Sequence, residues 1–143
     1  MKSKLLVFIQ FFVIFLMLLP LGSVPYRPIY GLVLLGIGLF VGALALSKNR
    51  LGNFNIRPDI KKDCQLVTTG IYSFIRHPMY TSVLLCMLSV VLLYPMPYEY
   101  GLFGILLLTL LVKLFYEESL WIYESKEYKE YSKKTKRLIP YLF

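Results

Sequence analysis

Four apolar segments, separated by polar ones, dominate the pattern along the chain. They run from Leu5 to Leu19, from Ile29 to about Ser47, from Met79 to about Tyr94 and from Gly101 to about Tyr116. A helix needs about 20 residues to cross the hydrocarbon of a bilayer, and a thinner bilayer with flanking aromatic and lysine side chains accommodates shorter ones. The pattern predicts an all-α integral membrane protein with about four transmembrane helices in a single membrane domain, 1–143.

The segments group into two halves. Short proline-containing turns follow the first and third segments, which predicts an N-terminal helical hairpin over 1–47 and a second hairpin later. A polar connector of about thirty residues, from Lys48 to His77, separates the halves. A loop of that length without regular structure is uncommon unless it is functional. We therefore expect the functional site in 48–143, which holds the connector, the second hairpin and the tail.

The first apolar segment has two interpretations. Its basic start and apolar core are typical of a signal peptide, but it lacks a small-x-small cleavage site, and a Pro20-Leu21-Gly22-Ser23 turn follows it. We expect an uncleaved helix.

The tail beyond Tyr116 is polar and has no glycine or proline before Pro140, which predicts a helix. Leu120, Trp121, Tyr128 and Tyr131 fall on one face of it. This predicts a C-terminal interfacial amphipathic helix, with its aromatic rings at headgroup level. The alternative is a solvated helical tail.

Composition and charge support a membrane location. The chain is 57% hydrophobic and 17% charged, against about 25% charged in soluble domains. Of its 16 basic residues, 15 fall in the N-terminus, the connector and the region from Lys113 onward, and only Arg27 lies in an outer turn. This bias predicts cytoplasmic N- and C-termini. The net charge of +8 favours anionic lipid over nucleic acid, because the charges lie between apolar segments.

Metal and disulfide chemistry have little support. The chain has two cysteines, Cys64 and Cys86, and one histidine, with no CxxC pair. We expect no metal site.

Two clusters carry candidate chemistry. Arg76 and His77 directly precede Pro78, which suits the first turn of a helix. A helix N-terminus beside an arginine suits a carboxylate or phosphate. The plainer interpretation has Arg76 on lipid phosphate and His77 as a cap. At the end of the fourth segment, Glu117 and Glu118 could pair with Lys113 one turn earlier, or hold a cationic or hydroxyl-bearing ligand.

Together these clusters resemble a known family. The run Leu-Val-Thr-Thr-Gly-Ile-Tyr-Ser-Phe-Ile-Arg-His-Pro-Met-Tyr over 66–80, then a hairpin, then Glu117-Glu118, the Glu-Tyr-Lys-Glu-Tyr of 127–131 and a late Ile-Pro resemble isoprenylcysteine carboxyl methyltransferases. Phospholipid N-methyltransferases share this general plan. The resemblance covers 65–140.

The resemblance implies a multi-spanning methyltransferase that binds S-adenosyl-L-methionine at the cytosolic face and methylates a lipophilic acceptor, such as an isoprenylcysteine-like carboxylate or a lipid headgroup. It places Lys113 near the acceptor. With Arg76 added for the cofactor's carboxylate, the expected cofactor contacts are Leu66, Val67, Tyr72, Arg76, His77, Pro78, Met79, Tyr80, Glu117 and Glu118.

Some points stay open at this stage. The spacing from the glutamates to Tyr128 is one residue shorter than in the family, and Ser125-Lys126 replaces Phe-Gly, so either glutamate could face the cofactor. No catalytic base is assigned. The alternatives are a membrane reductase that uses a nicotinamide cofactor and a non-catalytic small membrane subunit. Glycines in the second segment allow close helix packing within one chain or between copies, so the oligomeric state is open.

Overall fold

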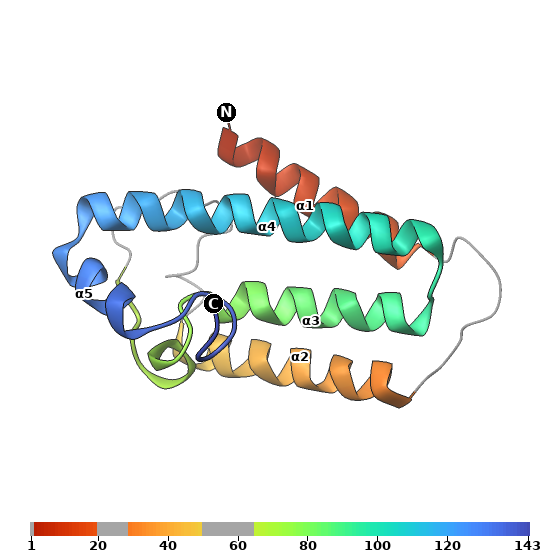
Figure 1. Ribbon diagram of the computed structural model, residues 1–143, viewed down its shortest axis with the longest axis horizontal. Coiled ribbons are helices and arrows are strands. Elements are labelled where there is room, and N and C mark those ends of the chain that lie inside the picture. Colours follow the sequence, from red (N-terminus) through yellow and green to blue (C-terminus); the bar gives the residue numbers. More distant parts are fainter. Residues whose placement is uncertain (1, 20–28, 50–64) are drawn as a thin grey trace.

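A computed structural model describes residues 2–19, 29–49 and 65–143 (Figure 1). In these ranges the chain forms five α-helices and one short 3-10 helix, and no strand. The elements in chain order are α1 (Lys2–Leu18), α2 (Ile29–Lys48), η1 (Gly70–Ser73), α3 (Pro78–Leu93), α4 (Pro97–Glu124) and α5 (Lys126–Lys134). The predicted all-α class is confirmed.

The four predicted apolar segments correspond to α1 to α4, with boundaries close to those expected. Helices α2 and α4, of 20 and 28 residues, are long and apolar enough to cross a membrane, whereas α1 and α3 are apolar but shorter. By this criterion two helices qualify as spans, fewer than the four expected. Pro78 begins α3 and Pro97 begins α4, since proline fits the first turn, where its missing N–H is not needed.

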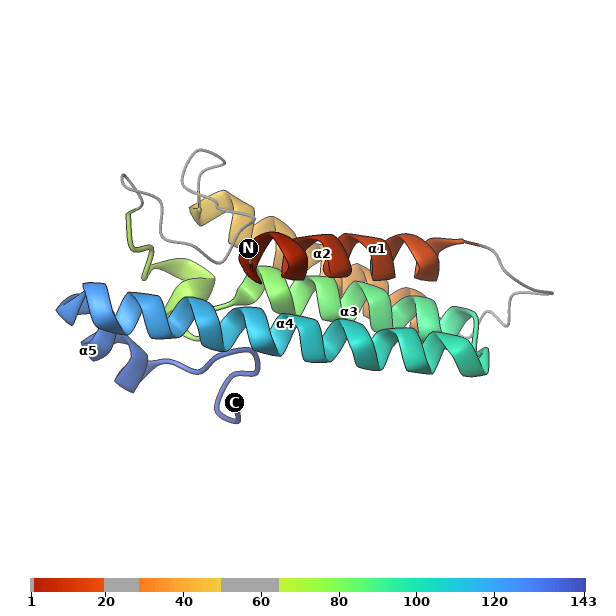
Figure 2. The same ribbon diagram turned by 90° about the horizontal axis from the view of Figure 1, so that it is seen from above.

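A close seam joins α2 and α3, which lie side by side in Figures 1 and 2. A Cβ added to Gly38 would lie 2.8 Å from Cys86 Sγ and 3.0 Å from the Cys86 backbone nitrogen. A Cβ on Gly42 would lie 2.7 Å from Ser82 Oγ, and that hydroxyl donates a 2.7 Å hydrogen bond to the Gly38 carbonyl. These glycines therefore allow close packing between two helices of the same chain.

The N-terminal helices find their main partners in the C-terminal half, which differs from the hairpin expected over 1–47. Helix α1 packs on α4, where Val13 and Met17 join Leu106 and Leu110 in the buried core, and α2 packs on α3. The glycines of α2 let α3 approach closely, whereas the buried apolar side chains of α1 pack against apolar side chains of α4. The expected contact between α3 and α4, across the short Tyr94–Met96 turn, is confirmed.

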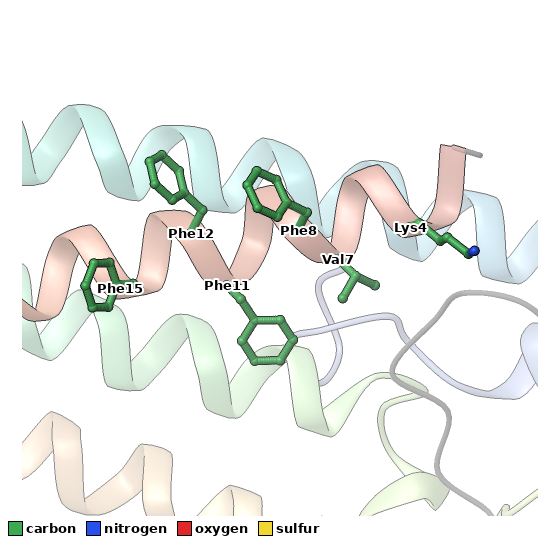
Figure 3. Close-up of a pocket in the computed structure, with 6 residues that line it drawn as sticks. All are labelled: Lys4, Val7, Phe8, Phe11, Phe12 and Phe15. Carbon is green, nitrogen blue, oxygen red and sulfur yellow. The ribbon is translucent and has the colours of Figure 1, made fainter.

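The outer face of α1 is aromatic. Phe8, Phe11, Phe12 and Phe15 are each at least half exposed and, with Lys4 and Val7, line a shallow cavity of about 570 Å³ (Figure 3). An apolar face turned away from the core suits hydrocarbon better than water.

The polar tail departs from the single interfacial helix that we expected. Helix α4 continues to Glu124, and a break at Ser125 separates it from the nine-residue α5. The Ser125 hydroxyl accepts a 3.1 Å hydrogen bond from the Tyr128 backbone N–H and caps α5. Tyr128 is only 3% exposed. The aromatic face therefore packs against protein, because the break turns α5 back toward the bundle (Figure 1).

Part of the predicted connector lies outside the described residues. This applies to Arg50, Arg57, Lys61, Lys62 and Cys64, and also to Arg27 in the first turn.

Candidate functional site

The chain segment after α5 binds to the segment before α3. A parallel bridge joins Ile75 and Lys136. The backbone N–H of Arg76 donates to the Lys136 carbonyl at 2.8 Å, and that of His77 donates to the Arg137 carbonyl at 3.0 Å. The Thr81 hydroxyl also donates to the Leu138 carbonyl at 2.8 Å. These bonds fix the tail against the N-terminus of α3.

Glu118 lies at the centre of a buried charge cluster. Its Oε1 accepts a 2.6 Å hydrogen bond from Arg76 Nε and lies 3.3 Å from His77 Nε2. Its Oε2 accepts a 2.8 Å bond from Arg137 Nε. The carboxylate side chain is 5% exposed. One carboxylate thus joins α4, the start of α3 and the tail, and both of its oxygens are occupied.

Arg76 points into the protein. Its Nη1 donates to the Ser132 carbonyl at 3.0 Å, to the Thr135 carbonyl, and to the Thr135 hydroxyl at 3.3 Å. The residue is 9% exposed. The plain interpretation, in which Arg76 held a lipid phosphate, is therefore wrong. Carbonyl oxygens at the end of α5 attract its guanidinium because they lack helical partners.

Glu117 has different surroundings from its neighbour. Its Oε2 accepts a 3.0 Å hydrogen bond from the Tyr80 hydroxyl, and the residue is half-buried. The rings of Tyr80 and His77 stack with centroids 5.3 Å apart and planes within 1°. His77 directly precedes α3 and Tyr80 lies in its first turn, and the two rings face one another across this helix start. This arrangement leaves Glu117 less enclosed than Glu118.

Lys113, one turn before Glu117, is buried at 1% exposure. Its Nζ donates a 2.5 Å hydrogen bond to Gln10 Oε1 of α1 and lies 5.3 Å from the centroid of the Tyr80 ring. The ammonium group is therefore next to the Tyr80–Glu117 pair.

The remaining expected residues surround this centre. Leu66 and Val67 are half-buried before η1, Tyr72 and Pro78 are buried, and Met79 is half-buried in α3. The structure connects Arg76, His77, Tyr80, Glu117 and Glu118 directly through their side chains.

Three tyrosines join η1 to α5. The Tyr131 hydroxyl donates a 2.5 Å hydrogen bond to the Tyr72 carbonyl, and the Tyr128 ring packs against those of Trp121 and Tyr131. Burial raises the pKa of Tyr131 to about 12, and burial also raises the pKa values of Tyr72 and Tyr128. All three stay neutral near pH 7, so Tyr131 keeps the proton that it donates.

A polar cavity of about 290 Å³ opens beside the Glu118 cluster, between the end of α4, the tail and α5. Its lining includes Arg76, Glu118, Thr135 and the basic run from Lys133 to Arg137. Within the described ranges, no group of histidine, cysteine, aspartate and glutamate residues is arranged to hold a metal ion.

Sequence reasoning missed two of these residues. Arg137 binds Glu118 from the tail, and Gln10 binds Lys113 from α1. Gln10 did carry a signal, because it is the one polar side chain inside the first apolar segment. Arg137 carried none, since it is one of several basic residues in the tail.

Comparison with known proteins gives one family. No curated protein matches the chain. The family model described as phospholipid methyltransferase matches residues 26–128, which include α2, α3, α4, both glutamates and the Arg-His-Pro motif. This family is membrane-associated, and its description implies a methyltransferase acting on lipids. The matched segment is well over half of the chain, and the chain belongs to the phospholipid methyltransferase family.

Proposed function

We propose that this protein transfers a methyl group from S-adenosyl-L-methionine to a lipophilic acceptor at the cytoplasmic membrane face. The family supplies the coarser statement, a methyltransferase acting on lipids. The cofactor, the acceptor and the site residues are our proposal. The acceptor that best fits the family is the headgroup of a phospholipid, rather than an isoprenylcysteine-like carboxylate.

The observation that carries the proposal is the difference between the two glutamates. Glu118 is held by two arginines, is next to His77 and is only 4% exposed, so both of its oxygens already have partners and little of it is open to a ligand. Glu117 accepts one hydrogen bond, from Tyr80, and is half-buried. A carboxylate oxygen has two lone pairs. Glu117 can therefore accept further bonds from a ligand, and we assign the cofactor contact to it.

The chemistry of these residues fits S-adenosyl-L-methionine. The cofactor carries an ammonium group and two ribose hydroxyls, and the Glu117 carboxylate would accept hydrogen bonds from these groups. The stacked His77 and Tyr80 rings, with Tyr72, would supply aromatic surface, and Leu66, Val67, Pro78 and Met79 apolar surface. In this proposal Arg76 and Glu118 act indirectly, because they hold α3, α4 and the tail in place. When bound, the cofactor supplies an electrophilic methyl group; the residues here bind, orient and exclude water.

We also propose that α1 to α4 all cross the bilayer, with both termini in the cytoplasm. Helices α2 and α4 are long enough by themselves. Helices α1 and α3 are shorter but pack on α4 and α2, and the aromatic outer face of α1 suits lipid. The glutamates and the tail would then lie at the cytoplasmic end of α4, within reach of a water-soluble cofactor.

The test is calorimetry with S-adenosyl-L-methionine on the purified protein in detergent. We expect saturable binding that Glu117→Gln weakens at least about tenfold, the usual effect of losing a charged hydrogen bond. Glu124→Gln is the matched control, since it makes the same change at an exposed position of the same helix. Transfer of labelled methyl to a phospholipid completes the assay. Saturable NADPH binding without donor binding would contradict the proposal and favour a reductase.

A further inference from the structure

The cavity beside the Glu118 cluster has a strongly basic lining. Its volume is about 290 Å³, close to the lower end of the range of about 300–1,000 Å³ for ligand pockets. Glu118 is the one carboxylate side chain in the lining, and both of its oxygens are bound by arginines. The cationic side chains of the lining are Arg76, Lys133, Lys134, Lys136 and Arg137. The cavity therefore suits an anion.

These cationic side chains are not equally available. Arg76 is taken up inside the protein, where it binds Glu118 and the end of α5. Lys133 forms an exposed ion pair with Glu130, whose charge also reaches Lys134. The lining keeps an excess of positive charge when Glu130 is counted as well. Lys134 and Lys136 are both exposed, so an anion can reach them.

Arg137 is held in an orientation that suits anion binding. Its Nε donates to Glu118 Oε2 at 2.8 Å, and its guanidinium carbon lies 5.2 Å from the centroid of the Phe115 ring and 5.3 Å from that of Phe143. Among the residues that the structure describes, no protein group accepts a hydrogen bond from its two Nη atoms. The side chain is 35% exposed. An arginine fork with free donors matches the oxygens of a phosphate.

The rest of the lining favours a lipid phosphate over a free one. Ile122, Leu142 and Phe143 add apolar side chains to the same cavity, and a free phosphate ion would gain nothing from them. Helix α4 has 28 residues, about 42 Å, against about 30 Å of hydrocarbon. Its last turns, with Glu118 and Ile122, therefore reach the headgroup level when the helix crosses a membrane. Basic pockets at this level bind anionic lipid headgroups.

We propose that this cavity binds the headgroup phosphate of an anionic phospholipid, held by Lys134, Lys136 and Arg137, with the lipid chains beside the apolar part of the lining. The site is separate from the cofactor contact proposed at Glu117 and does not depend on the methyl donor. Because Arg137 also binds Glu118, a lipid held here would stabilise the tail in its docked position.

The test measures binding to the full chain, purified in an excess of neutral detergent, by thermophoresis. The probes are a short-chain phosphatidylglycerol, a phosphatidylcholine with the same chains, and inorganic phosphate. We expect saturable binding of phosphatidylglycerol, at least about tenfold tighter than of the other two, because it alone combines a net negative charge with apolar chains. Equal affinity for inorganic phosphate would make the ligand a free anion, and equal affinity for phosphatidylcholine would remove the role of net charge. Either result, or no binding of phosphatidylglycerol, overturns the proposal.

Two matched double variants locate the binding. Lys134→Gln with Lys136→Gln removes two charges from the cavity lining and should weaken phosphatidylglycerol binding at least about tenfold. Lys126→Gln with Lys129→Gln removes the same charge from α5 outside the cavity and should leave the affinity unchanged. All four lysines are exposed, so both variants should fold. Equal losses in the two variants would show diffuse attraction to a basic surface and would overturn the site.

Discussion

At the scale of single residues, the two adjacent glutamates have different surroundings. Glu118 lies among Arg76, Arg137 and His77, while Glu117 meets the Tyr80 hydroxyl. Neighbours on a helix are about 100° apart around its axis, so one can face the tail while the other faces α3. The sequence showed a glutamate pair but gave no means of telling the two apart, because Arg137 lies 19 residues away along the chain.

Removal of the Glu118 carboxylate is expected to lower the stability of the protein strongly. Glu118→Ala would leave two guanidinium groups without their carboxylate, and we expect the free energy of unfolding to fall by about 3 kcal/mol, since removing one partner of a buried pair leaves the other uncompensated. Thermal unfolding in detergent, followed by circular dichroism, measures this.

Glu130→Ala is the matched control for that experiment. Glu130 pairs with Lys133 at 2.6 Å, but both side chains are more than 60% exposed, and exposed pairs contribute little. Equal effects of the two substitutions would show that the Glu118 cluster does not hold the tail.

At the scale of elements, the helices themselves were predictable and their partners were not. The apolar runs gave α1 to α4 to within a few residues, and proline marks the start of α3 and α4, but α4 is longer at both ends than expected. The break at Ser125 was missed, because no glycine or proline marks it and the capping serine resembles any other polar residue of the tail. The pairing of α1 with α4 depends on shape complementarity between faces, which periodicity does not describe.

The seam between α2 and α3 gives a matched pair of substitutions. Gly38→Ala would place a Cβ against the sulfur and backbone of Cys86, and we expect it to destabilise the protein by about 1–3 kcal/mol, as overpacking does. Gly36→Ala adds the same methyl where no atom lies within 4 Å. Both gain the same helix propensity, about 1 kcal/mol, so the difference in their midpoints of thermal unfolding isolates the contact. If the Gly38→Ala variant were as stable as Gly36→Ala, the close contact between α2 and α3 at Gly38 would be contradicted.

At the scale of the whole molecule, the sequence predicted where the site lies better than what holds it together. The charge bias and the Arg-His-Pro motif predicted a candidate site at the start of α3 and the end of α4, and the structure brings those residues together. The bonds that connect them to the tail, and to α1, join residues up to 103 positions apart. No local pattern encodes such contacts, because they arise only when the helices pack.

The proposed topology predicts which loops face outward. In a chain with Cys64 and Cys86 replaced by serine, a cysteine at Pro95, between α3 and α4, should react with a membrane-impermeant maleimide in intact cells. Cysteines at Lys4 and Tyr141, which are exposed in the structure, should react only after the membrane is permeabilised, because even-numbered crossings return both ends to one side. Labelling of Pro95 and Tyr141 from the same side would exclude four crossings.

The bridge between Ile75 and Lys136 also bears on how the protein is made. Synthesis proceeds from the N-terminus, so Arg137 is added only after all four apolar helices have been synthesised. Until then Glu118 lacks one of its arginines, and the start of α3 lacks its backbone partners from the tail. The bonds that join the helices to the tail can therefore form only at the very end of synthesis. A chain halted before residue 136 would contain all four apolar helices yet lack the tail's bonds to Glu118 and to the start of α3, and proteases could distinguish it from the finished protein.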